Sequence, residues 1–399
     1  MIAFIIALYL FYTLAKIYIS VSEINFVLKA KNLSAIILSN ENYQKAAEYK
    51  IVNEKFAIVS SFWDFALFLF WAVFGLKMLQ SLVITSGGIL QSTVFVFIFI
   101  AINFILSLPF DIYSVFVKDK RFGFSTIDIK TYVIDNIKSV AIFIIIGGLM
   151  ISLVAWILST FAFWWLWSFI AIFCVILFIN MFYPTFIAPL FNKFTPINDS
   201  ELKSSIETLM SKVGLKSSGI FMMDASKRDN RLNAYFGGLG KSKRVVLFDT
   251  LVKKLDKKEL LAVLGHELGH FKHKDILKNI ALMAVLLFIL FVLFGNLPTA
   301  LYEAFGLEKG AYSVIAIFLL LSSIASFIMM PLIGYLSRKN EYKADEYGSE
   351  CESKEALISA LMKLADENKS FPRSHRLFIV FYHTHPPLTE RLKALGADI

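Results

Sequence analysis

The sequence predicts a predominantly α-helical, polytopic membrane protein. Three observations support this prediction: 57% of the 399 residues are hydrophobic, only 18% are charged, and the mean hydropathy is +0.66. A soluble protein of similar size is about a quarter charged. The two cysteines, Cys174 in an apolar run and Cys351 in a polar segment, argue against a disulfide framework.

Seven stretches are apolar enough, over about 20 residues, to cross a bilayer. They are residues 2–20, 57–78, 90–110, 139–160, 162–186, 278–298 and 312–335. The first stretch has no basic segment before it and no small-residue cleavage site after it, so we expect an uncleaved anchor rather than a signal peptide. The chain is therefore expected to be an integral, multi-pass membrane protein.

The charges of the loops predict the orientation of these spans. Segments 21–56, 111–138, 187–277 and the tail after residue 335 are rich in basic residues, whereas the alternate loops are nearly bare. Basic loops remain in the cytoplasm, so the N-terminus is expected outside, in the plasma or bacterial inner membrane. Contact with anionic lipid headgroups accounts for the net charge of +9. No basic stripe with interleaved aromatic residues indicates a nucleic-acid partner.

The hydropathy pattern divides the chain into four parts. Residues 1–186 hold five spans with their loops, 187–277 form a cytoplasmic folded unit, 278–335 hold two more spans, and 336–399 form a second cytoplasmic segment.

The segment 187–277 has the signals of a small α+β unit. The stretch 196–214 starts with a capping cluster of Asn198, Asp199 and Ser200, and its apolar residues then recur at helical spacing, so a helix is expected there. "GIFMMDASK" reads as a strand, and "LNAYFGGLG" and "RVVLFD" read as two strands joined as a hairpin through "GKSK". Asp256 and Glu259 are three residues apart, as in a capping box, and predict a helix that runs toward the sixth span.

Histidines are confined to the last third of the chain, which indicates that the chemistry is there. They are His266, His270, His273, His375, His383 and His385. On a helix, His266 and His270 are one turn apart and project from the same face. Two such imidazoles can bind one zinc ion, and Glu267 beside them can take a proton from a water that the metal activates. The alternative is an ordinary polar helix end at the membrane surface.

A catalytic zinc needs a third protein ligand and one open position. His273 is close in sequence, but the next helical turn carries it past the metal. Glu341 and Asp345 are four residues apart in "NEYKAD", on a predicted helix. Glu341 is the better candidate for the third ligand, and Asp345 can accept the free N–H of a ligand histidine and fix its orientation. A solvated helix face is the alternative explanation of this polar stretch.

Several motifs in one order resemble the CAAX prenyl protease 1 family of integral-membrane zinc metallopeptidases. "HELGH" is followed about seventy residues later by "EYKAD" and then by "HTHPPLTERL". The segments "LPFDIYSVFV" (108–117), "IAPLFNKFTPI" (187–197) and "NAYFGGLGKSKRVVLFDTL" (233–251) are also similar to that family. The resemblance extends from the first third to the C-terminus, and the first hundred residues match mainly in hydropathy.

The resemblance implies a fold and an assignment for each site residue. The fold is a barrel of seven transmembrane helices around an internal chamber, closed on one side by the zinc domain. The implied zinc ligands are His266, His270 and Glu341, with Glu267 as catalytic base, Asp345 as partner of a ligand histidine and His385 as donor to the oxyanion. The implied substrate contacts are Asn233, Ala234 and Tyr235, together with Arg391, which matches a family arginine near the site. His383 remains an alternative to His385, and no role is assigned to His273 or His375.

The expected function is hydrolysis of peptide bonds by a membrane-embedded endopeptidase with one zinc ion per chain. Eukaryotic members of the family trim C-terminal tripeptides from prenylated proteins, so a prenylated C-terminus is one expected substrate. If the source is bacterial, quality control of membrane proteins is the alternative. A transporter is a further alternative, which the scarcity of ionisable residues in the spans disfavours.

Overall fold

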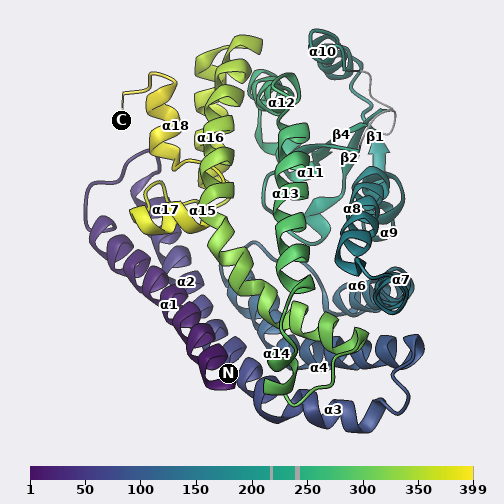
Figure 1. Ribbon diagram of the computed structural model, residues 1–399. Helices are drawn as coiled ribbons and strands as arrows, with labels where there is room; N and C mark the ends of the chain where they lie inside the picture. Colours follow the sequence, from purple (N-terminus) through teal and green to yellow (C-terminus); the bar gives the residue numbers. More distant parts are fainter. Residues whose placement is uncertain (216–218, 239–242, 399) are drawn as a thin grey trace.

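Seven helices of the computed structural model are long and apolar enough to cross a membrane, among the residues that it describes (1–215, 219–238 and 243–398) (Figure 1). They are α1 (Ile2–Ala30), α2 with α3 (Asn40–Phe70 and Leu76–Val83), α4 with α5 (Ile89–Tyr113 and Asp119–Arg121), α6 with α7 (Ile129–Ile142 and Gly148–Thr160), α8 with α9 (Trp164–Phe182 and Ala188–Phe191), α13 (Asp275–Gly295) and α15 (Ala311–Cys351). Each predicted stretch overlaps one of them, so the predicted number of spans is confirmed.

The helices extend further than the apolar stretches that predicted them. Single π-helical turns at Trp71–Gly75, Ser114–Lys118, Phe143–Gly147 and Tyr183–Ile187 join the paired segments named above. α1 continues for ten residues beyond the predicted end at residue 20, and α15 continues through the polar sequence that contains Glu341. The boundary placed at residue 335 therefore falls inside one continuous helix. The helix of the seventh span carries Glu341 into the polar unit, the part of the protein formed by segments 187–277 and 336–399.

Paired charges lie on the first two spans, where the sequence was expected to be almost free of ionisable residues. Lys16 Nζ on α1 is 3.6 Å from Asp64 Oδ2 on α2. Nearer the polar unit, Lys50 Nζ is 3.6 Å from Glu23 Oε1 and 3.4 Å from Glu54 Oε1. Charges inside a membrane segment are costly unless they pair, and here each cation faces a carboxylate on the same helix or its neighbour.

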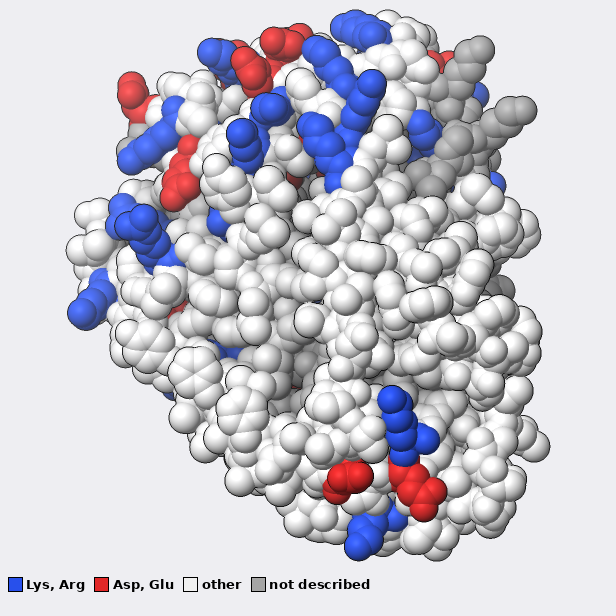
Figure 2. All heavy atoms as spheres, viewed as in Figure 1, with Lys and Arg blue, Asp and Glu red and all other residues white. Residues whose placement is uncertain are grey.

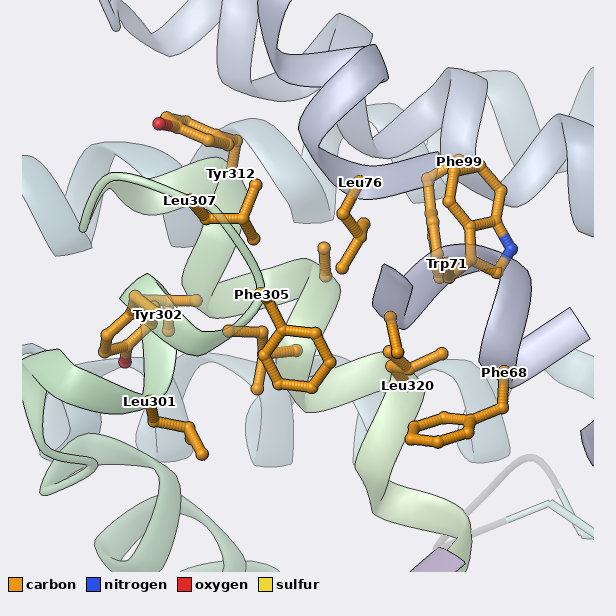
Figure 3. Close-up of a cluster of buried hydrophobic side chains, with 14 of the residues drawn as sticks. Phe68, Trp71, Leu76, Phe99, Leu301, Tyr302, Phe305, Leu307, Tyr312 and Leu320 are labelled. Atoms are coloured by element: carbon orange, nitrogen blue, oxygen red, sulfur yellow. The ribbon is translucent and has the colours of Figure 1, made fainter. Parts of the chain in front are cut away.

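The spans form a barrel, with the folded segment 187–277 and the C-terminal helices together at one end (Figure 1). At the other end, the short helix α14 (Thr299–Ala304) and the loop after it pack onto α3 and α4. Figure 3 shows part of the hydrophobic cluster formed there, in which Trp71 and Phe99 lie together with ring centroids 4.7 Å apart. This cluster closes the barrel end that is remote from the histidines.

A four-stranded sheet forms the base of the polar unit. Its strands are β1 (Phe194–Pro196), β2 (Ile220–Met223), β3 (Ala234–Gly237) and β4 (Arg244–Phe248), in the order β1-β2-β4-β3. β3 and β4 pair antiparallel, as the predicted hairpin requires, while β2 and β4 are parallel. In the predicted "GKSK" turn, residues 240–242 lie outside the described residues. The sequence reading missed β1, a three-residue strand that contains a proline.

Helices α10 (Ser200–Ser211), α11 (Asp249–Lys254), α12 (Lys257–Lys272) and α16 (Lys354–Glu367) pack with the sheet and α15 around a second core. The 3₁₀ turn Ala225–Lys227 follows β2, and the chain closes with α17 (Arg376–Tyr382) and α18 (Leu388–Ala394). Fully buried leucines at 247, 251, 264 and 268 belong to this core, and each contributes about 2 kcal/mol to folding. The core fixes α12, which carries the two histidines of the motif.

Helix α12 begins and ends at identifiable signals. The predicted capping box is confirmed: Glu259 N donates to Asp256 Oδ1 and Asp256 N donates to Glu259 Oε2, each over 2.9 Å. Glu259 also accepts from Ser359 and Lys363 of α16. The helix does not run on into the sixth span, because Lys274 has a left-handed backbone with φ of 58° and starts α13 in a new direction.

Candidate active site

Glycines bring α12 and α15 into direct backbone contact. A Cβ atom on Gly348 of α15 would lie 2.9 Å from the backbone nitrogen of His266, and one on Gly269 of α12 would lie 2.8 Å from Cα of Ala344. Real Cβ atoms do not approach this closely, so only glycine fits at these two positions. The close crossing places the motif histidines against the polar turn of α15 that contains Glu341.

Two imidazoles and one carboxylate converge at this crossing. His270 Nε2 lies 3.2 Å from Glu341 Oε1, and His266 Nε2 lies 3.6 Å from Glu341 Oε2. One ligand atom from each of the three residues lies within 4.8 Å of the others. Glu341 is 2% exposed, and its Oε2 accepts no hydrogen bond of good geometry from the described residues. Two nitrogens and one oxygen with a remaining open side fit a divalent metal ion in a catalytic site.

Carboxylates behind the two histidines orient the rings. Nδ1 of His266 lies 2.8 Å from Asp345 Oδ1, and Nδ1 of His270 donates to Asp275 Oδ2 over 3.1 Å. Burial opposes protonation of His270, but its hydrogen bonds to Glu341 and Asp275 outweigh this effect and raise its pKa to about 9. Both rings therefore present Nε2 to the same point, and the negative surroundings attract a cation.

Asp275 was not singled out in the sequence, although it follows His270 by only five residues. Replacing it with alanine is expected to weaken metal affinity by about 10- to 100-fold, because such partners fix the tautomer and orientation of a ligand histidine. A competition titration against a chelator of known affinity measures this change. The control is Lys278→Ala, which removes the other partner of Asp275, 2.9 Å away. Equal losses in both variants would contradict a role through His270.

Arg391 contacts the carboxylates directly. Its Nε donates to Asp345 Oδ2 over 2.8 Å and its Nη2 to Asp345 Oδ1 over 2.6 Å, while Nη2 is 3.8 Å from Glu341 Oε2. The sequence reading assigned Arg391 to substrate contacts, and that assignment remains a prediction. In the structure the guanidinium is mostly buried and forms a two-pronged pair with Asp345, which holds the carboxylate beside His266.

Glu267 follows His266 on α12, and its carboxyl group interacts electrostatically with His266, His270, Glu341 and His385. Burial raises the pKa of Glu267, and the positive charges of His266 and His270 counteract the shift. A carboxylate in such a position can accept a proton near neutral pH, as a general base must. Glu267 is thus on the same helix as the two histidines, and its role as the general base remains a prediction.

The loop after α17 brings His385 to the same place. His385 Nδ1 lies 2.7 Å from Glu341 Oε2, and its side chain is 62% exposed, so it faces open space as well as the site. Arg338, one turn before Glu341, donates to the carbonyl oxygens of Ile379 and His383 over 2.9 and 2.6 Å. These bonds attach the end of α17 and the start of the loop to α15.

The first span holds the other end of this segment. Glu23 of α1 is fully buried and accepts from Ser374 Oγ over 2.5 Å and from His375 N over 2.7 Å. His383 Nε2 is 3.3 Å from the same Ser374 hydroxyl. The segment 374–385 is therefore fixed at Glu23 and at Arg338. Neither residue could be found from sequence, because the contact of Glu23 spans about 350 residues.

Replacing Glu23 with glutamine is expected to lower kcat on the order of 10- to 100-fold without loss of metal, because a displacement of about 1 Å at a catalytic group has such an effect. The glutamine side chain would offer a single carbonyl oxygen to the two donors, Ser374 Oγ and His375 N. The control is Glu54→Gln, which removes another partner of Lys50 but has no recorded hydrogen bond to segment 374–385 among the described residues. Steady-state kinetics with metal analysis decide: an unchanged kcat in Glu23→Gln would contradict positioning of this segment through Glu23.

The other histidines lie outside the cluster. His273 is the C-cap of α12, and His375 is the N-cap of α17. Burial, with the nearby charges of Lys50 and Arg338, lowers the pKa of His383 to about 4. A neutral, half-buried His383 held by Ser374 is a structural partner of the loop, so the structure favours His385 over His383 as the donor near the site.

Asn233, Ala234 and Tyr235 lie at the edge of the sheet. β3 is the outermost strand, and it packs near α12. On its inner side, Phe248 N donates to Asn233 O over 3.1 Å. An edge strand beside a catalytic helix can accept a further strand through its free backbone groups. The geometry agrees with the predicted position of a substrate backbone, which remains a prediction.

Comparisons with known proteins assign the family. The family model described as "Peptidase family M48" matches residues 196–398, just over half of the chain. The chain belongs to peptidase family M48. A second model, "CAAX prenyl protease N-terminal, five membrane helices", matches residues 27–193, close to the predicted five-span segment 1–186. Together the two models cover this M48 peptidase from the last turn of α1 to residue 398, apart from residues 194 and 195.

Individual relatives are similar to this M48 peptidase over nearly the whole length of its chain. CAAX prenyl protease 1 of Saccharomyces cerevisiae is 34% identical, over 90% of this chain and 86% of the relative. The CAAX prenyl protease 1 homolog of Taenia solium is 32% identical, over 91% and 88%. The crystal structure of S. mikatae Ste24p superposes with a TM-score of 0.89 at 29% identity, covering 99% of this chain and 98% of that one. The chain is thus a membrane-embedded metallopeptidase of the CAAX prenyl protease 1 family, and this membership disfavours the transporter alternative.

Proposed function

We propose that the chain is a zinc-dependent endopeptidase with His266, His270 and Glu341 as the metal ligands. The observation that supports this most is the convergence of two imidazoles and a buried carboxylate, from helices far apart in sequence, on one open point. Histidine nitrogens and a glutamate oxygen in this number are the donor set of catalytic zinc sites. One ion per chain fits the cluster.

The substrate would lie extended along the free edge of β3. Backbone groups of Asn233, Ala234 and Tyr235 would pair with it as with an added strand, which brings the scissile bond beside α12. Added-strand pairing recognises the backbone and leaves side-chain selection to other surfaces. This edge therefore orients the peptide without fixing its sequence.

The chemistry would be divided among three side chains. When bound, zinc lowers the pKa of water and polarises the scissile carbonyl. Glu267 takes the proton of the attacking water and delivers it to the leaving amine. His385 donates to the oxygen on which negative charge develops, where a positioned donor contributes most. Asp345, held by Arg391, keeps the ring of His266 in its orientation.

The proposed substrate is the C-terminus of a prenylated protein, as the names of the relatives suggest. The proposed orientation has the N-terminus outside and the peptidase unit in the cytoplasm, where prenylated proteins are made available. Figure 2 is consistent with this placement: most of the charged side chains on the face shown gather at the end of the molecule that holds α10, α12 and α16, and few lie on the belt below it.

The deciding experiment compares a prenylated CAAX peptide with its unprenylated twin, in detergent or nanodiscs, with and without a chelator. We expect release of the C-terminal tripeptide from the prenylated peptide, loss of cleavage with chelator, and recovery after addition of zinc. Cleavage that survives the chelator would contradict the zinc mechanism. Equal cleavage of both peptides would instead support a general peptidase in membrane-protein quality control.

A further inference from the structure

A cavity of about 540 Å³ lies beside the peptidase unit, where α13 enters the membrane. Four lysines line it from different parts of the chain: Lys212 after α10, Lys243 before β4, Lys272 at the end of α12, and Lys274 before α13. No acidic residue is among the described residues that line this cavity. The folded chain thus gathers four amines in one hollow, which the sequence alone does not reveal.

Two aromatic rings line part of the cavity, and each makes a cation–π contact with one of the lysines. Lys243 Nζ lies 4.0 Å from the centroid of the Phe271 ring, and Lys272 Nζ lies 4.0 Å from that of Tyr347. The ion pair recorded for Lys272 is a long one of 4.0 Å to the exposed Glu350. A cation–π contact leaves the outer side of an ammonium group accessible, so the amine of Lys272 can also face a negatively charged ligand in the cavity.

The apolar part of the cavity faces the bilayer. Ile276 and Leu277, in the first turn of the sixth span, belong to the lining, and Leu277 is 61% exposed. A free phosphate or nucleotide would gain nothing from these side chains, whereas acyl chains would. Figure 2 shows basic groups at this level directly above the uncharged belt. Position and lining therefore point to a ligand with a phosphate head and apolar chains.

We propose that this cavity binds the phosphate headgroup of an anionic phospholipid from the surrounding bilayer. Basic pockets at the ends of membrane helices bind such headgroups, and each lysine near the surface adds to the attraction. A bound headgroup would also hold the connection between α12 and α13, which contains the left-handed Lys274 and is followed by Asp275, the partner of His270. The site is separate from the peptidase reaction and requires no assumption about it.

Lipid retention tests the proposal on the full-length protein. The chain is extracted from membranes that contain phosphatidylglycerol and phosphatidylcholine, and bound lipids are counted by native mass spectrometry. The test variant is Lys272→Gln/Lys274→Gln. The matched control is Lys258→Gln/Lys354→Gln, which removes two exposed lysines of the same polar unit that do not line the cavity. We expect the test variant to bind phosphatidylglycerol on the order of tenfold more weakly, and the control to bind as the parent chain does.

Three results would overturn the proposal. The first is equal loss of phosphatidylglycerol from both double variants, which would indicate general surface charge. The second is equal retention of phosphatidylcholine and phosphatidylglycerol by the parent chain. The third is complete displacement of the lipid by millimolar inorganic phosphate, which would indicate a free-phosphate site. Monodisperse elution and unchanged metal content of the test variant show that it is folded, so a loss of lipid reports on the cavity.

Discussion

Replacing Glu267 with glutamine is expected to abolish peptide hydrolysis while the metal stays bound. The substitution keeps the size of the side chain and leaves His266, His270 and Glu341 unchanged, but glutamine cannot accept the proton of the attacking water. General bases contribute about 10²- to 10⁴-fold to catalysis, so kcat should fall by at least the lower of these factors. Steady-state hydrolysis of a labelled peptide, together with metal analysis of the same preparation, measures both quantities.

Two comparisons make the Glu267 experiment decisive. Glu346→Gln neutralises an exposed carboxylate on α15, next to Asp345, and should retain the parent rate. The prediction is wrong if Glu267→Gln cleaves at the parent rate. If this variant instead loses its metal, Glu267 helps to hold the ion, and the division between ligands and base must be revised.

The membrane part of the fold was predictable because hydropathy alone defines a span. Lipid requires long apolar helices, and seven such stretches can be counted directly. The ends of the helices were not predictable in the same way. α15 continues past its apolar part because its polar turns are buried against α12 and α16, and the sequence does not show which polar residues will find such a partner.

Local motifs gave the part of the site that lies on one helix. His266, Glu267 and His270 follow from spacing, and the glutamate–aspartate pair at 341 and 345 follows from the need for a third ligand. Residues that act through distant contacts were missed. Glu23 reaches Ser374 across the whole chain, and Arg338 holds a loop that the sequence does not place next to it. Only the folded barrel brings the first span to the loop of His385.

The charged pairs on α1 and α2 show a second limit of sequence reading. A lysine or glutamate near the end of an apolar stretch reads as a loop residue, and Glu23 and Lys50 were assigned to the loop 21–56. In the structure Glu23 and Lys50 both lie on long helices. Lys50 Nζ also lies 3.6 Å from the centroid of the Phe378 ring, so the Glu23–Lys50 ion pair connects the barrel with α17. Because α1 and α2 extend beyond their apolar parts, two charges that were expected in a loop form a contact between the membrane helices and the C-terminal segment.

Replacing Glu341 with alanine is expected to remove both the metal and the activity. Glu341 is the only one of the three proposed ligands outside α12, and its carboxylate is also the group that His270 and His385 face. Two histidines alone leave the ion with too few protein ligands for a catalytic zinc site. Metal analysis should therefore fall from about one zinc per chain to a small fraction, with hydrolysis lost in parallel.

Glu346→Ala on the same helix is the control for this variant, because Glu346 lies between Ala344 and Gly348 of the crossing but its side chain is exposed. Retention of a full equivalent of zinc by Glu341→Ala would exclude Glu341 as a ligand and reopen the choice of the third donor. Loss of zinc with a normal elution profile would show that the ion is held across the two helices. The seventh span would then be part of the metal site.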